Sequence, residues 1–180
     1  MKATQVRPTG VERTLGDDEL IVTKTDQRGV ITYVNDTFLR LSALSEAEAL
    51  GQPHNLIRHP DMPRAVFKLL WDTLAEGQEV FAYVVNLAAD GAHYWVLAHV
   101  TPSYGVGGAL TGYHSFRRRP EPAAVSAITG VYAELRAEEQ RHADSPTALQ
   151  ASWDLFQRML AGRGQTYDEF VWELTNEARS

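Results

Sequence analysis

The residues best suited to chemistry in this chain stand together in the segment RHPDMP, which begins at Arg58. Arg58 supplies a cation, His59 a titratable ring and Asp61 a carboxylate within four consecutive positions. Two prolines fix the backbone φ of the segment, so less conformational entropy is lost when it becomes ordered. Such a segment can close a ligand pocket with polar groups. It can equally be a surface loop in which Arg58 and Asp61 form an ion pair.

The composition excludes several kinds of chemistry. The chain of 180 residues contains no cysteine, which excludes disulfides, thiolate metal sites, cysteine nucleophiles and covalent cysteinyl adducts with a cofactor. No nucleophile stands with a base in a pattern committed to catalysis, and we assign neither catalytic nor metal-ligating residues. We therefore expect a protein that is not an enzyme.

Charge and hydropathy limit the partners. The net charge is −6, with 23 acidic against 17 basic residues, which gives no broad basic surface for nucleic acid or an anionic membrane. The run Arg117, Arg118 and Arg119 is the one local exception, and we interpret it as a solvated strand end. The sequence has no apolar N-terminal signal segment and no apolar run long enough to span a bilayer. We expect a cytoplasmic protein.

The elements that must position RHPDMP are strands and short helices. Two β-rich runs joined by a glycine-containing turn precede it, and three runs joined by hairpin-type turns follow it. The predicted strands are Glu19–Thr25, Val30–Asn35, Val80–Leu87, His93–Pro102 and Ala109–Phe116.

Three helices are expected between the second and third strands. Thr37–Ser42 has helical spacing, and Ser45 and Glu48 form a capping box for a second short helix. A longer helix begins at Pro63 and continues to residue 76. Apolar residues spaced three and four apart predict that one stripe of this helix is buried, namely Val66, Phe67, Leu70, Trp71 and Leu74.

This order of elements predicts an α+β fold, with a five-stranded antiparallel sheet, short helices on one side and a cavity between them. Residues 1–18 are a loose tail or a short N-terminal cap, and 19–119 form the sheet domain. Residues 120–180 form an extension of three helices. These helices pack on each other or on the sheet, or they bind a partner or a second subunit, and the pattern leaves both alternatives open.

The stretch from Glu19 to Arg119 resembles the PAS domain of bacterial aerotaxis receptors. The similar segments are VNDTF, GQPHNLIRHPDMP, FKLLWDTLAEG, DGAHYWV and GYHSFR. The resemblance implies a cytoplasmic sensor that holds FAD non-covalently and reports redox state or oxygen.

The resemblance also implies a set of FAD-binding residues, and their chemistry suits the task. An amide such as Asn86 can donate to and accept from the edge of the flavin ring, although a strand asparagine can instead bond to a turn. Trp71 matches a family tryptophan beside the flavin, although it can be an ordinary core residue. The full predicted set is Arg58, His59 and Asp61 for the phosphates or ribose, and Trp71, Asn86, Asn35, His114, Val96 and Ala98 for the remainder.

Strand alternation orders part of this set. Tyr94, Val96 and Ala98 share one face of their strand and are apolar enough to line the ring slot, whereas Trp95 and Leu97 share the other. We expect the second face to receive a helix or a second subunit, because an uncovered apolar patch is a liability. His114 stands where light-sensing flavin relatives carry a glutamine, and it can bond to the flavin or be a satisfied core histidine.

The leading hypothesis is thus an FAD-binding sensor that acts as a homodimer, through its sheet surface and helices, or contacts a signalling protein through residues 120–180. A haem-binding gas sensor is an alternative, since five histidines offer axial ligands. A ligand-free dimerisation module is another. An absorption spectrum separates the three.

Overall fold

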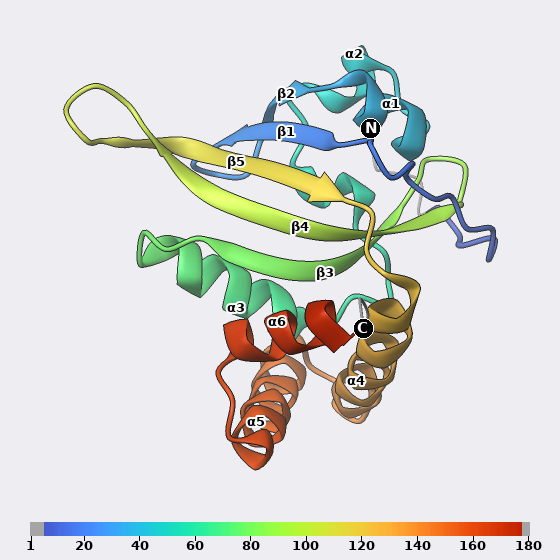
Figure 1. The fold of residues 1–180 in the computed structure, drawn as a ribbon, viewed down its shortest axis with the longest axis vertical. Helices are drawn as coiled ribbons and strands as arrows, with labels where there is room; N and C mark the ends of the chain where they lie inside the picture. The colour runs from blue at the N-terminus through green and yellow to red at the C-terminus, as the bar shows by residue number, and fades with distance from the viewer. Residues whose placement is uncertain (1–5, 178–180) are drawn as a thin grey trace. The chain divides into compact units, whose positions relative to one another are not determined.

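The computed structural model describes residues 6–177. Its five strands form one sheet in the order β2-β1-β5-β4-β3, and the β1–β2, β1–β5 and β4–β5 pairs are antiparallel (Figure 1). The strands are β1 Ile21–Asp26, β2 Ile31–Val34, β3 Val80–Leu87, β4 His93–Tyr104 and β5 Leu110–Arg118. The predicted α+β class with a five-stranded antiparallel sheet is confirmed, and each strand lies within two residues of its expected bounds.

The chain divides into two compact units, and each unit is discontinuous in sequence. Unit 1 consists of Met1–His59 and Val84–Arg119, and unit 2 of Pro60–Tyr83 and Pro120–Ser180. The boundary falls inside RHPDMP and again inside β3. The sequence-based division at residues 19–119 does not foresee that residues 60–83 group with the C-terminal helices.

The helices of unit 1 are short, and side chains cap the first two of them. They are α1 Asp36–Ser42, α2 Glu46–Ala49 and the 3₁₀ helix η1 His54–Ile57. Both hydrogen bonds of the predicted capping box between Ser45 and Glu48 are present, which confirms that box. Helix η1 carries no periodic apolar pattern, and the sequence did not indicate it.

Residues 6–18 form a cap, so the alternative of a loose tail is wrong for this part of the N-terminal segment. Residues 1–5 of the predicted tail lie outside the described residues. The backbone N–H of His93 donates to the carbonyl of Val11, and the N–H of Arg13 donates to the carbonyl of His93, both at 2.8 Å. Leu15 is fully buried. Backbone pairing and one apolar anchor therefore fix this segment within unit 1.

Unit 2 is a group of helices with the first residues of β3. Its helices are α3 Arg64–Ala75, α4 Pro122–Gln140, α5 Ser145–Arg163 and α6 Tyr167–Glu177. Helix α5 contacts α3 and α4, and α4 contacts α6. The Tyr83 hydroxyl lies 2.8 Å from Thr175 Oγ1, and the Tyr132 hydroxyl donates to the Tyr83 carbonyl at 2.6 Å. The C-terminal helices thus pack on each other, as one of the two predicted alternatives had it.

The buried side of α3 differs from the predicted stripe. Ala65, Val66, Leu69 and Leu74 are buried, whereas Trp71 is 43% exposed. Trp71 stands two positions after Leu69, about 200° further around the helix, so the two side chains cannot share the buried side. The prediction that Trp71 belongs to the buried stripe is wrong.

Candidate functional site

The central strands of unit 1 bring a set of buried polar side chains to one face of the sheet. The register pairs Thr23 with Ser115 in β1 and β5, and Ala98 with Arg117 in β4 and β5. Because paired residues share a face and alternate residues along a strand share a face, these four lie on the same side. We call this side the inner face. It also carries Ile21, Tyr94 and Val96, all fully buried.

Several polar atoms of the inner face have no hydrogen-bond partner. They are the Tyr94 hydroxyl, Ser115 Oγ and Nη1 of Arg117, and all three side chains are buried. Buried polar groups in folded proteins are almost always paired, and each unpaired donor costs free energy. Three of them on one face make the inner face the candidate surface for a polar ligand.

Arg117 is anchored on one side by a histidine. Its Nη2 lies 2.7 Å from His54 Nε2, and Thr23 Oγ1 lies 3.5 Å from the same nitrogen. A guanidinium can only donate, so His54 Nε2 accepts and the imidazole is neutral. Burial, with the charge of Arg117, holds the pKa of His54 well below its usual value. Burial also lowers the pKa of Arg117 to about 10, and raises the pKa of Tyr94.

Two of the predicted residues from separate segments meet. Arg58 and Asn86 form an isolated antiparallel β-bridge, which places the start of RHPDMP beside β3. Asn86 is 4% exposed and its Nδ2 has no hydrogen-bond partner. His59 is also buried, and its ring meets that of His93 edge to face at a centroid distance of 5.9 Å. Arg58 itself is exposed.

Val96 and Ala98 lie buried on the inner face, but His114 does not share it. The register pairs His114 with Lys24 and Thr101, and its ring lies 4.3 Å from that of Phe116. These residues alternate with the inner-face positions, so they belong to the opposite face, which we call the outer face. His114 therefore does not share a face with Val96 and Ala98, and its buried Nε2 has no hydrogen-bond partner, so it is not the satisfied core histidine of the second alternative. Burial and the charge of Lys24 lower the pKa of His114.

The predicted apolar patch on the outer face is smaller than expected. Leu97 is buried and Trp95 is half-buried, whereas Phe116 is 40% exposed. Of these three apolar side chains on the outer face, that of Phe116 is the most exposed to solvent.

Asn35 has a structural role. Its Oδ1 accepts from the backbone N–H groups of Val22 at 3.0 Å and Phe38 at 3.2 Å, and its Nδ2 donates to the Leu20 carbonyl at 2.8 Å. The amide therefore caps α1 and fastens it to the start of β1. The prediction that Asn35 binds the cofactor finds no support in this arrangement.

Asp61 and Trp71 belong to unit 2, apart from the seven other predicted residues. Both are exposed. Unit 1 therefore gathers Arg58, His59, Asn86, Val96 and Ala98 as the predicted residues that remain candidates within one compact unit.

Arg117 is the buried residue that the sequence analysis missed. The interpretation of residues 117–119 as a solvated strand end holds for Arg118, which is exposed, and is wrong for Arg117, which is 6% exposed. Strand alternation separates the two, because neighbours along a strand point to opposite faces. To assign Arg117 to the buried face, one needs the register of β5 with its neighbouring strands, and the local sequence pattern does not give that register.

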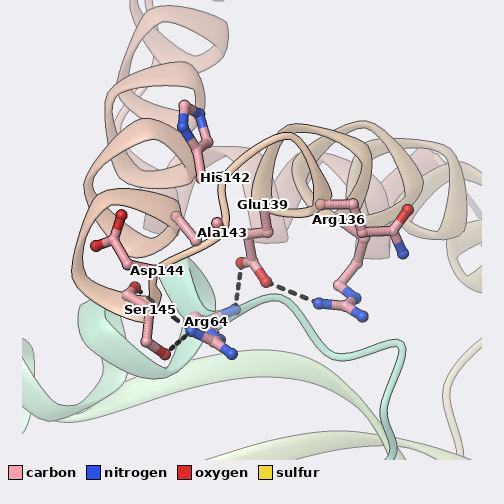
Figure 2. A pocket seen from close by; sticks show the side chains of 9 residues that line it. Arg64, Arg136, Glu139, His142, Ala143, Asp144 and Ser145 are labelled. Carbon is pink, nitrogen blue, oxygen red and sulfur yellow. Dashed lines mark hydrogen bonds and ion pairs between the residues drawn. The ribbon is translucent and has the colours of Figure 1, made fainter.

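A second polar site lies within unit 2. A pocket of about 320 Å³ has nine lining residues, namely Arg64, Arg136, Glu139, Gln140, His142, Ala143, Asp144, Ser145 and Ala148. Figure 2 shows the backbone nitrogen of Arg64 and the side chain of Arg136 joined to the carboxylate of Glu139. Glu139 Oε1 accepts from the backbone N–H of Arg64 at 2.6 Å, and Arg136 Nη1 donates to Oε2 at 2.9 Å. The Arg64 side chain bonds to Ser145 Oγ.

Glu139 thus serves as a cap supplied from another helix. The Arg64 N–H is one of the unpaired donors at the N-terminus of α3, where a carboxylate is favoured by both hydrogen bonding and the helix dipole. Because Glu139 bonds both to the start of α3 and to Arg136 of α4, the pocket is a structural joint between α3 and the end of α4.

Two further findings concern the described residues. Within residues 6–177, no three His, Asp or Glu side chains gather closely enough to hold a metal ion. Over the same range, no helix has the length and apolarity that crossing a bilayer requires.

Residues 21–119 match the PAS fold family, and the chain belongs to that family. It is 40% identical over 123 residues to the aerotaxis receptor of Escherichia coli (strain K12), which covers 68% of this chain and 24% of the receptor. It is 33% identical over 97 residues to the nitrogen fixation regulatory protein of Klebsiella pneumoniae, which covers 54% of this chain and 20% of that protein. The chain therefore spans about a quarter or less of the length of these relatives.

Among solved structures, the fold is similar to that of a light-oxygen-voltage domain studied with a flavin analogue. The TM-score is 0.54 at 17% identity, and the match covers 68% of this chain and 87% of that one. The resemblance of residues 19–119 to the PAS domain of aerotaxis receptors is thus confirmed.

The neutral state of His54 makes stability depend on pH. The unfolded chain binds a proton at His54 below about pH 6.5, whereas the folded protein does not until lower pH because the pKa of His54 is lowered. The free energy of unfolding should therefore fall as pH drops from 7.5 to 5.5, by at most about 1.4 kcal/mol per pH unit from this group.

Urea denaturation of the full chain at both pH values tests this. His54→Gln keeps an acceptor for Arg117 and should show a smaller fall than wild type. Asn55→Ala, which changes an exposed residue that does not titrate in this range, should keep the wild-type fall. An equal fall in wild type and His54→Gln would contradict the assignment.

Glu139→Ala should destabilise the protein. The change leaves the Arg64 N–H and Arg136 without their acceptor, and hydrogen bonds to charged groups contribute about 1.5 to 3 kcal/mol. The matched control is Glu138→Ala, which removes ion pairs to Arg141 and His142 nearer the surface and should cost much less. Chemical denaturation followed by circular dichroism measures both, and similar losses would show that the cap has no special importance.

Proposed function

We propose that this chain is a non-enzymatic cytoplasmic sensor domain that binds FAD non-covalently and reports redox state or oxygen. The observation that carries the proposal is Asn86, whose buried amide nitrogen has no partner and stands beside Arg58 through their β-bridge. The similarity to the aerotaxis receptor supports a redox or oxygen stimulus. The light-oxygen-voltage domain studied with a flavin analogue supports a flavin as the ligand.

The residues of unit 1 fit a flavin by their chemistry. Asn86 offers a donor and an acceptor to the pyrimidine edge of the ring. Val96 and Ala98 are small, apolar and buried on the inner face, which suits an aromatic ring. Arg58 is an exposed cation at the start of RHPDMP and suits a phosphate, with His59 beside it.

Asp61 and Trp71 remain proposed members of the site through their similarity to the family pattern. Trp71 offers a large exposed aromatic surface, and Asp61 offers a carboxylate that can orient a neighbouring cation or bind a ribose hydroxyl. His114 and Asn35 are left out, the first because it lies on the outer face and the second because its amide is used as a helix cap.

When bound, the flavin supplies reversible electron transfer, with a change of charge and protonation on its ring. The residues of the chain orient the ring and exclude water from it. They also respond to the change at the ring through particular atoms, namely those of the Asn86 amide. The Asn86 amide can present either its nitrogen or its oxygen, so a change of protonation opposite it favours one orientation over the other. Since Asn86 and Arg58 are bridged through their backbones, a shift at β3 reaches RHPDMP directly.

The signal leaves the domain through an oligomer or a partner. We propose a homodimer that uses the outer face of the sheet together with the helices. A signalling protein that contacts residues 120–180 is the other proposed recipient, and we propose no nucleic-acid or membrane partner.

The absorption spectrum of the purified chain tests the cofactor. We expect flavin bands and, after extraction, FAD. Asn86→Ala and Arg58→Ala should lower FAD occupancy at least tenfold at limiting FAD, because about 1.4 kcal/mol of lost binding energy corresponds to that factor. Asn55→Ala, an exposed asparagine on η1, is the control that keeps wild-type occupancy.

A Soret band or a colourless wild-type protein would refute the FAD proposal in favour of haem or of a ligand-free module. Full FAD occupancy in Asn86→Ala would refute the residue assignment alone.

Sedimentation analysis tests the dimer. Wild type should sediment as a dimer, and Phe116→Glu should shift it to monomer because a charge would then be buried at the interface. Val106→Glu, at the fully exposed tip between β4 and β5, should remain dimeric. A monomeric wild type would exclude signalling through the dimer and leave the partner route.

A further inference from the structure

Arg117 is a buried cation without an anion. Its side chain is 6% exposed, and its neighbours on the adjacent strands are Ile21 and Ala98, neither of which carries a charge. His54 is neutral and accepts from one nitrogen, and the other terminal nitrogen has no partner. Among residues 6–177, the structure gives Arg117 no carboxylate partner, whereas Arg119 pairs with Asp17 at 2.7 Å.

Such a cation is expensive for the folded protein. Transfer of a charge out of water costs several kcal/mol unless the charge is paired and hydrogen-bonded. A hydrophobic residue of similar volume between Ile21 and Ala98 would satisfy packing without that cost. Stability of the ligand-free fold therefore does not explain why this position holds an arginine.

The groups around Arg117 are also incomplete. Ser115 stands two residues earlier on the same face of β5, and Tyr94 lies on that face in β4. Both side chains are buried and their hydroxyls have no partner. A guanidinium and two hydroxyls on one face provide donors for an electronegative or anionic group that the protein itself does not contain.

We infer that Arg117, through the Nη1 atom that has no partner, binds an electronegative edge of the ligand held on the inner face. The inference rests on the proposed function, so that this edge belongs to the flavin ring. His54 is a positioning residue: it accepts from Nη2 and thereby leaves Nη1 available for the ligand.

This assignment gives Arg117 a role that differs from that of Asn86. The Asn86 amide can adapt to either protonation state, whereas the guanidinium keeps its charge and cannot accept. A fixed cation beside the ring favours whichever state of the flavin carries more negative charge, and this is the reduced state when the ring gains electrons. Arg117 therefore raises both the affinity for FAD and the midpoint potential.

Three variants of the full chain test the inference. Arg117→Met removes the charge and keeps much of the volume, and Arg117→Lys keeps the charge without the planar fork. Arg118→Met is the matched control, because Arg118 is adjacent in sequence, exposed and on the other face. For each protein we would measure the dissociation constant for FAD, the midpoint potential and the thermal midpoint of the flavin-free form.

We expect Arg117→Met to bind FAD at least tenfold more weakly and Arg117→Lys to lie between it and wild type. A tenfold loss of preference for the reduced flavin would make the midpoint potential about 30 mV more negative for a two-electron couple. The flavin-free Arg117→Met protein should unfold at the wild-type temperature or above it, because removal of an unpaired buried cation relieves a cost. Arg118→Met should match wild type in all three measurements.

The opposite results would overturn the inference. An insoluble Arg117→Met protein, or one with a strongly lowered thermal midpoint, would show that Arg117 serves the fold. Unchanged FAD binding and potential would show that the guanidinium does not meet the ligand, while the proposed function would stand. A wild-type protein that binds no flavin would overturn the proposed function, and this inference with it.

Discussion

The antiparallel register of β1, β5 and β4 is the constraint on which the proposed site depends. Since side chains alternate along each strand, a shift of one residue would exchange the inner and outer faces completely. In the observed register, Thr23, Ser115 and Arg117 lie with Ala98, and His114 lies with Lys24 on the other side. The chemistry available to a ligand on the inner face is therefore decided by backbone pairing before any side chain adopts a rotamer.

Local patterns in the sequence were sufficient to predict the strands and most of the helices, with η1 as the exception. Alternation and turn residues located the five strands, and the capping box at Ser45 located α2, because these signals act over a few residues. The site depended on information of longer range. Burial of Arg117 follows from its partners on two other strands, and the exposure of Trp71 follows from which side of α3 faces its neighbours. Neither property is encoded near the residue concerned.

The family resemblance supplied a list of site residues, and the structure sorts that list by physical role. The Nδ2 atom of Asn86 has no partner and is available to a ligand, whereas the amide of Asn35 is already bonded to three backbone groups. Hydrogen bonding therefore separates these two asparagines, which the sequence pattern treated alike. Arg117 shares with Asn86 a buried donor that has no partner, although no local motif marks it.

The cap that Glu139 places on α3 has a consequence for the order in which the chain can fold during synthesis. Arg64 and Glu139 are separated by 75 positions, and β4 and β5 lie between them in the sequence. On a ribosome, α3 emerges long before the residue that completes its first turn, and the intervening strands emerge before α4 to α6. Unit 1 can therefore form its central strand pairs while α3 still lacks its helical neighbours, and unit 2 can be completed only after α4 to α6 have emerged.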